Sequence, residues 1–131
     1  MFSIGEINVF VTDLERALKF WSDGLQLDIA EKEQLAHSAY ARLDFADGSP
    51  PIRLFASAAP WPPGERPAYG THPMIAFDLV TADIDAALAR LIECGGSKAG
   101  EVEVYENTRC VFVNDPDGNT IELVEVPAAE D

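Results

Sequence analysis

Two stretches of the sequence share one pattern and decide the fold: residues 7–18 read INVFVTDLERAL, and residues 77–88 read FDLVTADIDAAL. In each stretch a short apolar segment typical of a strand leads into an acidic residue and then into apolar residues at helical spacing. Asp47-Gly48 and Asp117-Gly118 follow at matching positions, and each precedes another short apolar segment. We interpret the chain as a duplication of about 55 residues, with two copies filling it.

Each copy is predicted to hold a strand, a helix and three further strands. Thr12 is expected to cap the first helix, with Glu15 completing a capping box, and Gly24 is expected to end it. Asp83 is expected to cap the second helix, and Gly95-Gly96 to stop it. The further strands are expected at residues 28–34, 38–45, 52–56, 102–105, 109–113 and 120–126. The predicted fold class is α+β, with a βαβββ module occurring twice.

The two modules are expected to form a single domain over residues 1–131, as module 1 (residues 4–56), a linker (residues 57–73) and module 2 (residues 74–126). Five of the nine prolines fall in the linker, which excludes a helix or a central strand there. Two interpretations of this segment are open. It is a surface connector, or it is a lid or a crossover to a partner chain that carries Trp61 and Tyr69.

Composition excludes several classes of protein. The chain has 131 residues, a net charge of −14 and two cysteines. It has no apolar run of the ~20 residues that a membrane span needs, and its N-terminus lacks the pattern of a signal peptide. Lys and Arg are too few for nucleic-acid binding, and the cysteine content fits a cytoplasmic location. Cys94 and Cys110 are expected to be small core or half-buried residues rather than nucleophiles.

Two motifs carry a resemblance to a known family: residues 11–21, VTDLERALKFW, and residues 115–123, DPDGNTIEL. With the tandem modules, they resemble the glyoxalase/bleomycin-resistance/dioxygenase family, also called the vicinal oxygen chelate superfamily, over about residues 4–126. The resemblance implies that each module's strands curl into a half-open cup of mixed sheet. It also implies that two cups, from one chain or from a homodimer, enclose a small-molecule site.

In metal-using members of that family, four side chains on the first and last strands of each module bind a divalent ion. The resemblance places these positions on Glu6, Arg53, Met74 or Ala76, and Glu122. Arg53 has no lone pair to offer a cation, and a thioether is a poor ligand for hard metals. No cofactor is therefore expected. A divalent metal stays possible through a reserve set of Glu6, His72 and Glu122.

The function expected from this set is small-molecule binding with a degraded metal site. The ligand is expected to be an oxygenated organic or a cationic molecule, sequestered or transformed, in the manner of bleomycin-resistance members. Arg53 is a candidate to recognise a carboxylate, enolate or phenolate, and Glu122 to accept a proton or a cationic group. Asn8 and Met74 complete the expected binding set, and Tyr40 and Arg109 are further pocket candidates.

Two other interpretations are open. One is an inert charge network in which Arg53 neutralises Glu6 and Glu122. The other is a metal-dependent glyoxalase-like lyase or isomerase, or a ring-cleaving dioxygenase, that uses Glu6, His72 and Glu122. In every case a homodimer is expected, because each module leaves a sheet edge and an open mouth.

Overall fold

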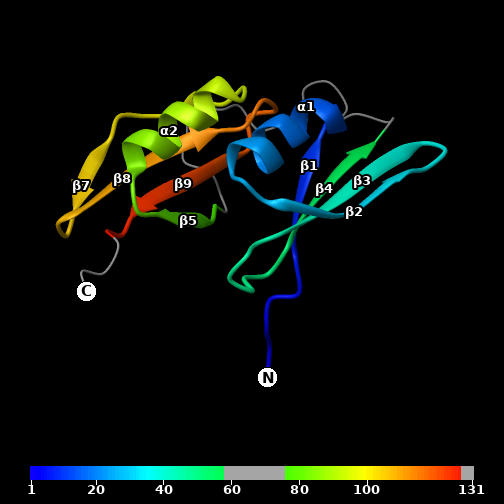
Figure 1. Ribbon diagram of the computed structural model, residues 1–131, viewed down its shortest axis with the longest axis horizontal. Helices are drawn as coiled ribbons and strands as arrows, with labels where there is room; N and C mark the ends of the chain where they lie inside the picture. Colours follow the sequence, from blue (N-terminus) through cyan, green and yellow to red (C-terminus); the bar gives the residue numbers. More distant parts are fainter. Residues whose placement is uncertain (58–75, 128–131) are drawn as a thin grey trace. The chain divides into compact units, whose positions relative to one another are not determined.

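The computed structural model describes residues 1–57 and 76–127, which belong to two compact units (Figure 1). Unit 1 comprises Met1–Pro67 and unit 2 comprises Ala68–Asp131, and each is described by itself. The segment 58–75, which contains most of the proline-rich linker with Trp61 and Tyr69, lies outside the described residues. No helix in the described part of the chain is long and apolar enough to cross a membrane.

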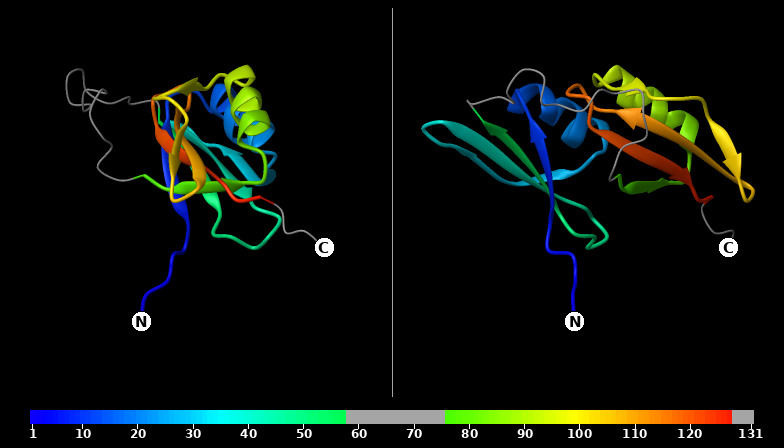
Figure 2. Two further views of the ribbon diagram at one scale, coloured as in Figure 1. Left: turned by 90° about the vertical axis from the view of Figure 1, so that its left-hand side faces the viewer. Right: turned by 180° about the vertical axis from the view of Figure 1, so that it is seen from behind.

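Unit 1 is a four-stranded mixed sheet with one helical segment. Its elements are β1 (Ile7–Val11), α1 (Leu14–Leu18), η1 (Lys19–Gly24), β2 (Asp28–Gln34), β3 (Ser38–Asp44) and β4 (Ile52–Ser57). The strand order is β1-β4-β3-β2, with β1 parallel to β4 and the other pairs antiparallel. The left view of Figure 2 shows the helical segment on one side of this sheet.

The core of unit 1 lies between that helical segment and the facing side of the sheet. Alternate residues along the strands are buried, among them Val9 on β1 and Leu54 on β4. Phe20 and Trp21 are fully buried, and their rings meet edge to face with centroids 5.2 Å apart. The other side chains of β1, β3 and β4 therefore project from the opposite face of the sheet.

The helical segment departs from the sequence prediction at its start and ends at Gly24 as predicted. Asp13, not Thr12, caps α1, and its carboxylate accepts a hydrogen bond of 3.0 Å from the backbone N–H of Arg16. The predicted capping box is therefore wrong. After Leu18 the helix widens into a π-helix that ends at Gly24, and the residue with a left-handed backbone is Gln26 (φ 58°).

Unit 2 is a five-stranded mixed sheet with one longer helix. Its elements are β5 (Asp78–Thr81), α2 (Ile84–Glu93), β6 (Ser97–Lys98), β7 (Glu103–Tyr105), β8 (Thr108–Asn114) and β9 (Thr120–Glu125). The order is β5-β9-β8-β6, with β7 also paired to β8 and β5 parallel to β9. Asp83 caps α2 as predicted, and Gly95 follows it with φ 104°. The predicted α+β fold class is confirmed, and β6 is the strand that was not predicted.

The turn between β8 and β9 is held by one buried carboxylate. Asp115, only 3% exposed, accepts hydrogen bonds from the backbone N–H groups of Asp117 (2.9 Å) and Asn119 (2.7 Å). Its second oxygen accepts a 3.0 Å bond from the Asn119 side-chain amide. Gly118 takes the left-handed backbone conformation (φ 85°) that this turn requires. The motif at residues 115–119 thus fixes the register of β9 on β8.

Candidate functional site

Seven side chains share the face of the unit 1 sheet that is turned away from α1. We call this surface the Arg53 face, and it comprises Glu6, Asn8, Phe10, Tyr40, Arg42, Arg53 and Phe55. Six of these residues follow from strand alternation, because they alternate with buried residues along β1, β3 and β4. Glu6 precedes β1 and joins the set through its ion pair with Arg53. Asn8 and Arg42 are the register partners of Arg53 on the two flanking strands. Three predicted site residues of unit 1, Glu6, Asn8 and Arg53, thus lie together.

Arg53 is held by a carboxylate and an aromatic ring. Its Nε lies 3.1 Å from Oε1 and 3.3 Å from Oε2 of Glu6, and its guanidinium carbon lies 4.7 Å from the ring centroid of Tyr40. The two side chains of the ion pair are 27% and 33% exposed. Within the described residues, the two terminal nitrogens of Arg53 donate no hydrogen bond. This guanidinium is therefore fixed in place with donors to spare.

The neighbours of Arg53 are engaged with one another. The Tyr40 hydroxyl donates a 3.2 Å hydrogen bond to Glu31, and partial burial together with the Glu31 carboxylate raises the pKa of Tyr40. Arg42 forms ion pairs with Glu31 (3.4 Å) and with Asp44 (3.3 Å). Tyr40 thus supports Arg53 from β3, whereas Arg42 on the same strand is occupied by two carboxylates.

Phe10 and Phe55 add an apolar surface next to Arg53. Their rings meet edge to face, with centroids 6.2 Å apart and planes inclined by 69°. Phe10 is 54% exposed, which is unusual for so large an apolar side chain. Phe55 is also the register partner of Tyr40, so three aromatic residues lie in one row across β1, β4 and β3. Neither phenylalanine was predicted as a site residue.

Glu122 lies on unit 2, and its partner there is Asp78. The two residues face each other across the parallel pair of β5 and β9. Burial, followed by the charge of the Asp78 carboxyl and a hydrogen bond with it, raises the pKa of Glu122. Burial and the charges of Glu122, Glu103 and Asp78 raise the pKa of the nearby Cys110 thiol. Sequence reasoning missed Asp78, although its position on a strand parallel to the final one was a usable signal.

Arg109, a further pocket candidate, lies on the face of the unit 2 sheet that carries α2, whereas Glu122 lies on the other face. Arg109 makes two 3.0 Å hydrogen bonds to the Glu125 carboxylate and pairs with Asp85 of α2 at 3.0 Å. These bonds raise the pKa of Arg109 and lower that of Glu125. Glu125 also accepts a 2.9 Å bond from the backbone N–H of Ile84 at the start of α2. Arg109 therefore links α2 to the sheet of unit 2 through ion pairs with Asp85 and Glu125.

The residues at the expected metal positions do not fit a divalent ion in unit 1. Arg53 presents only N–H groups, and its Nε already satisfies Glu6. In the described part of the chain, no three side chains among His, Cys, Asp and Glu come together to hold a metal ion. Ala76, one alternative for the third position, is exposed and has no donor side chain. Met74 and His72 lie outside the described residues.

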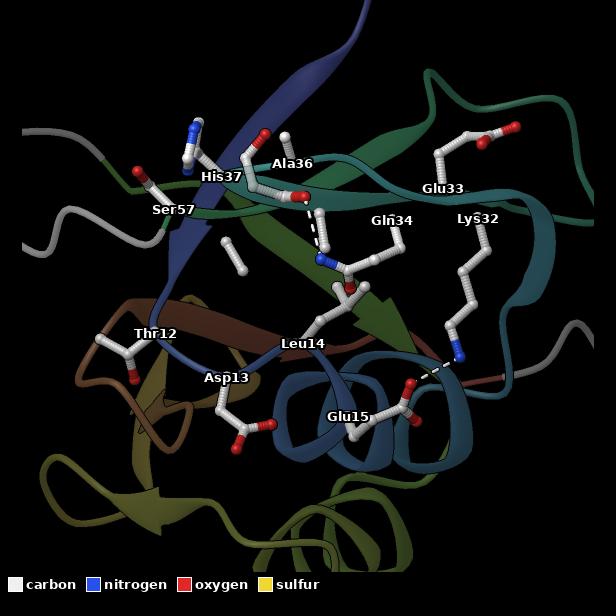
Figure 3. A pocket seen from close by; sticks show the side chains of 13 residues that line it. Thr12, Asp13, Leu14, Glu15, Lys32, Glu33, Gln34, Ala36, His37 and Ser57 are labelled. Carbon is white, nitrogen blue, oxygen red and sulfur yellow. Dashed lines mark hydrogen bonds and ion pairs between the residues drawn. The ribbon is translucent and has the colours of Figure 1, made fainter.

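A separate pocket of about 400 Å³ lies in unit 1, at the N-terminal end of α1 (Figure 3). Its lining includes Leu14 on the helix, His37 in the β2–β3 hairpin and Ser57 at the end of β4. A 2.6 Å ion pair between Lys32 and Glu15 closes one side of it. Its lining includes none of the residues of the Arg53 face, so the predicted site residues do not form it.

Comparison with known proteins places the chain among relatives of this fold. A sequence model of the Glyoxalase/Bleomycin resistance protein/Dioxygenase superfamily matches residues 3–123. No curated protein matches the sequence. A glyoxalase family protein from Bacillus cereus superposes with a TM-score of 0.78 at 20% identity, covering 98% of this chain and 96% of that one.

Two further solved structures share the fold. An antibiotic-binding protein from a Streptomyces species superposes with a TM-score of 0.68 at 24% identity, covering 98% of both chains. Glyoxalase I from Zea mays superposes with a TM-score of 0.70 at 21% identity, covering 92% of this chain and 45% of that one. At these identities the structural likeness shows the fold alone. The predicted family resemblance is confirmed by the match over residues 3–123: the chain belongs to the Glyoxalase/Bleomycin resistance protein/Dioxygenase superfamily.

Proposed function

We propose that the chain binds a small oxygenated organic molecule on the Arg53 face, with no metal ion at the positions that metal-using relatives employ. The observation that carries this proposal is Arg53 itself. Its guanidinium is oriented by Glu6 and Tyr40, and it has donors to spare for a carboxylate, enolate or phenolate. An antibiotic-binding protein shares this fold, so the fold is compatible with the binding of a small organic molecule.

Two further assignments belong to the same proposal. The protein acts as a homodimer, and Glu122 serves as an acceptor of a proton or a cationic group on unit 2. A raised pKa is what a carboxyl group needs in order to exchange a proton nearer neutral pH, which supports that role for Glu122. A monomeric mass in sizing with light scattering would contradict the dimer.

The metal-free part of the proposal is tested by elemental analysis of protein purified without chelators. We expect less than about a tenth of an equivalent of Ni, Zn, Mn or Fe, and no rise in melting temperature on adding these ions, because a specifically bound ion stabilises the folded state. A stoichiometric ion would favour the reserve hypothesis of a metal enzyme that uses Glu6, His72 and Glu122.

The binding part is tested with a matched pair of variants. Arg53→Gln removes the oriented guanidinium, whereas Arg42→Gln removes its register partner on β3, which is already occupied by Glu31 and Asp44. Titration calorimetry with a panel of small organic acids should show binding by the wild type and by Arg42→Gln, and loss of binding by Arg53→Gln. Equal affinities in both variants would refute the role of Arg53.

A further inference from the structure

The Arg53 face holds two parallel rows of side chains, and their chemistry indicates which class of ligand the face can bind. One row is aromatic and runs across three strands as Phe10, Phe55 and Tyr40. The other runs across the same strands as Asn8, Arg53 and Arg42. Neighbouring strands are about 4.8 Å apart and same-face residues along a strand about 6.8 Å apart. The aromatic row is therefore about 10 Å long, with the guanidinium row beside it.

The aromatic row presents more apolar surface than packing in unit 1 requires. Phe10 is 54% exposed, and Phe55 and Tyr40 are half-buried on a face turned away from the core. The 69° inclination of the two phenylalanine rings offers a ring face and a ring edge side by side. A flat aromatic molecule can meet both surfaces in the offset and edge-to-face geometries that aromatic pairs prefer.

The charges beside this row select the sign of the ligand. Arg42 is satisfied by two carboxylates, whereas Arg53 is paired through Nε and its terminal nitrogens have no hydrogen-bond partner in residues 1–57 and 76–127. The ion pair with Glu6 and the contact with the Tyr40 ring orient the guanidinium of Arg53. A carboxylate or phenolate can therefore accept hydrogen bonds from N–H groups that are already oriented. The net charge of −14 repels an anion at long range, but at physiological salt such repulsion is screened beyond about 8 Å.

From these observations we propose that the ligand of the Arg53 face is a planar aromatic molecule of about two fused rings with one anionic oxygen group. The anionic group pairs with Arg53, and the rings lie against Phe55 and Phe10. This inference rests on the proposed function, because it names the class of molecule that the same face binds.

The test compares four probes of similar size: 2-naphthoate, its neutral alcohol 2-naphthalenemethanol, its cationic amine 2-naphthylmethylammonium, and the saturated acid decalin-2-carboxylate. Titration calorimetry should rank 2-naphthoate first. Phe55→Leu keeps the apolar volume but removes the ring, and it should weaken 2-naphthoate binding roughly three- to tenfold, which is the effect of losing one aromatic contact. Tyr105→Leu, at an exposed aromatic residue of unit 2, is the matched control and should leave the affinity unchanged.

Each outcome separates the two proposals. If decalin-2-carboxylate binds as tightly as 2-naphthoate and both depend on Arg53, the aromatic class is overturned while the proposed function stands. If the cationic amine binds tightest, the charge assignment is overturned. If no probe binds and Phe55→Leu instead weakens dimerisation in analytical ultracentrifugation, the occupant of the Arg53 face is a second copy of the chain. The ligand class and the small-molecule role of the Arg53 face are then both overturned, whereas the homodimer stands.

Discussion

Replacing Asp115 by alanine should destabilise the protein, because its buried carboxylate holds the turn between β8 and β9. Asp115 is 3% exposed and accepts three hydrogen bonds, two of them from backbone N–H groups of its own turn. Alanine removes the acceptor of these hydrogen bonds from a largely buried turn. Hydrogen bonds to a charged acceptor contribute about 1.5–3 kcal/mol each, and losses within one turn overlap, so we expect a loss of about 3 kcal/mol.

The loss is measurable by thermal unfolding. For a chain of this size, 1 kcal/mol corresponds to about 4 °C, so the melting temperature of Asp115→Ala should fall by about 12 °C. Asp115→Asn keeps one acceptor oxygen for the backbone N–H groups, so its melting temperature should lie between those of the wild type and Asp115→Ala. Circular dichroism at low temperature verifies that each variant still folds.

Asp47→Ala is the matched control. Asp47 occupies the corresponding turn of unit 1, where its carboxylate accepts bonds from the backbone and hydroxyl of Ser49, but the residue is exposed. Water can replace the hydrogen bonds of the Asp47 carboxylate, so Asp47→Ala should change the melting temperature much less than Asp115→Ala does. A shift below about 2 °C for Asp115→Ala, or equal shifts for the two variants, would refute the assignment of the Asp115 turn as a stabilising element.

Three further outcomes are expected. Gly95→Ala should lower stability by about 1–2 kcal/mol in chemical denaturation, because its φ is +104° and the added Cβ would lie 3.3 Å from Pro116, whereas Gly100→Ala has open space and should be neutral. Trp21→Ala should cost about 3–5 kcal/mol by the same assay, because the side chain is fully buried. Glu122→Gln should raise the melting temperature at pH 7 and flatten its pH dependence. A carboxyl whose pKa is higher in the folded state contributes stability at low pH that is lost as pH rises from about 4.3, its unfolded pKa, through the folded pKa.

Most of the fold could be predicted because the strands and helices carry their own local signals. The alternation of β1 and the cap and stop signals of α2 predicted those elements with their observed bounds. The first cap was misassigned because Thr12 and Asp13 are both competent caps and adjacent. The choice depends on where β1 stops pairing with β4, at Val11, which no local pattern reveals.

The candidate site was less predictable because it depends on register between strands. The family resemblance placed Glu6 and Arg53 at the first and last strands of module 1, and the structure brings the two side chains together. The contact of Arg53 with Tyr40 depends on how β3 pairs with β4 across the loop 45–51, and that pairing has no local signature. The face on which Arg109 lies could not be predicted for a related reason, because alternation defines two faces without saying which one the helix covers.

The duplication supplies equivalent positions, and the residues at those positions decide the chemistry. Asn8 and Arg53 are register partners in unit 1, as Asp78 and Glu122 are in unit 2. In unit 1 Arg53 presents N–H donors that its ion pair with Glu6 orients, whereas in unit 2 burial and the charge of Asp78 raise the pKa of Glu122. One backbone geometry thus places a guanidinium on the last strand of one copy and a carboxyl group with a raised pKa on the last strand of the other. Membership of the superfamily predicts where the functional positions lie but not what they bind, because the side chains at those positions differ in charge, and Arg53 offers only N–H donors where a metal ligand must offer a lone pair.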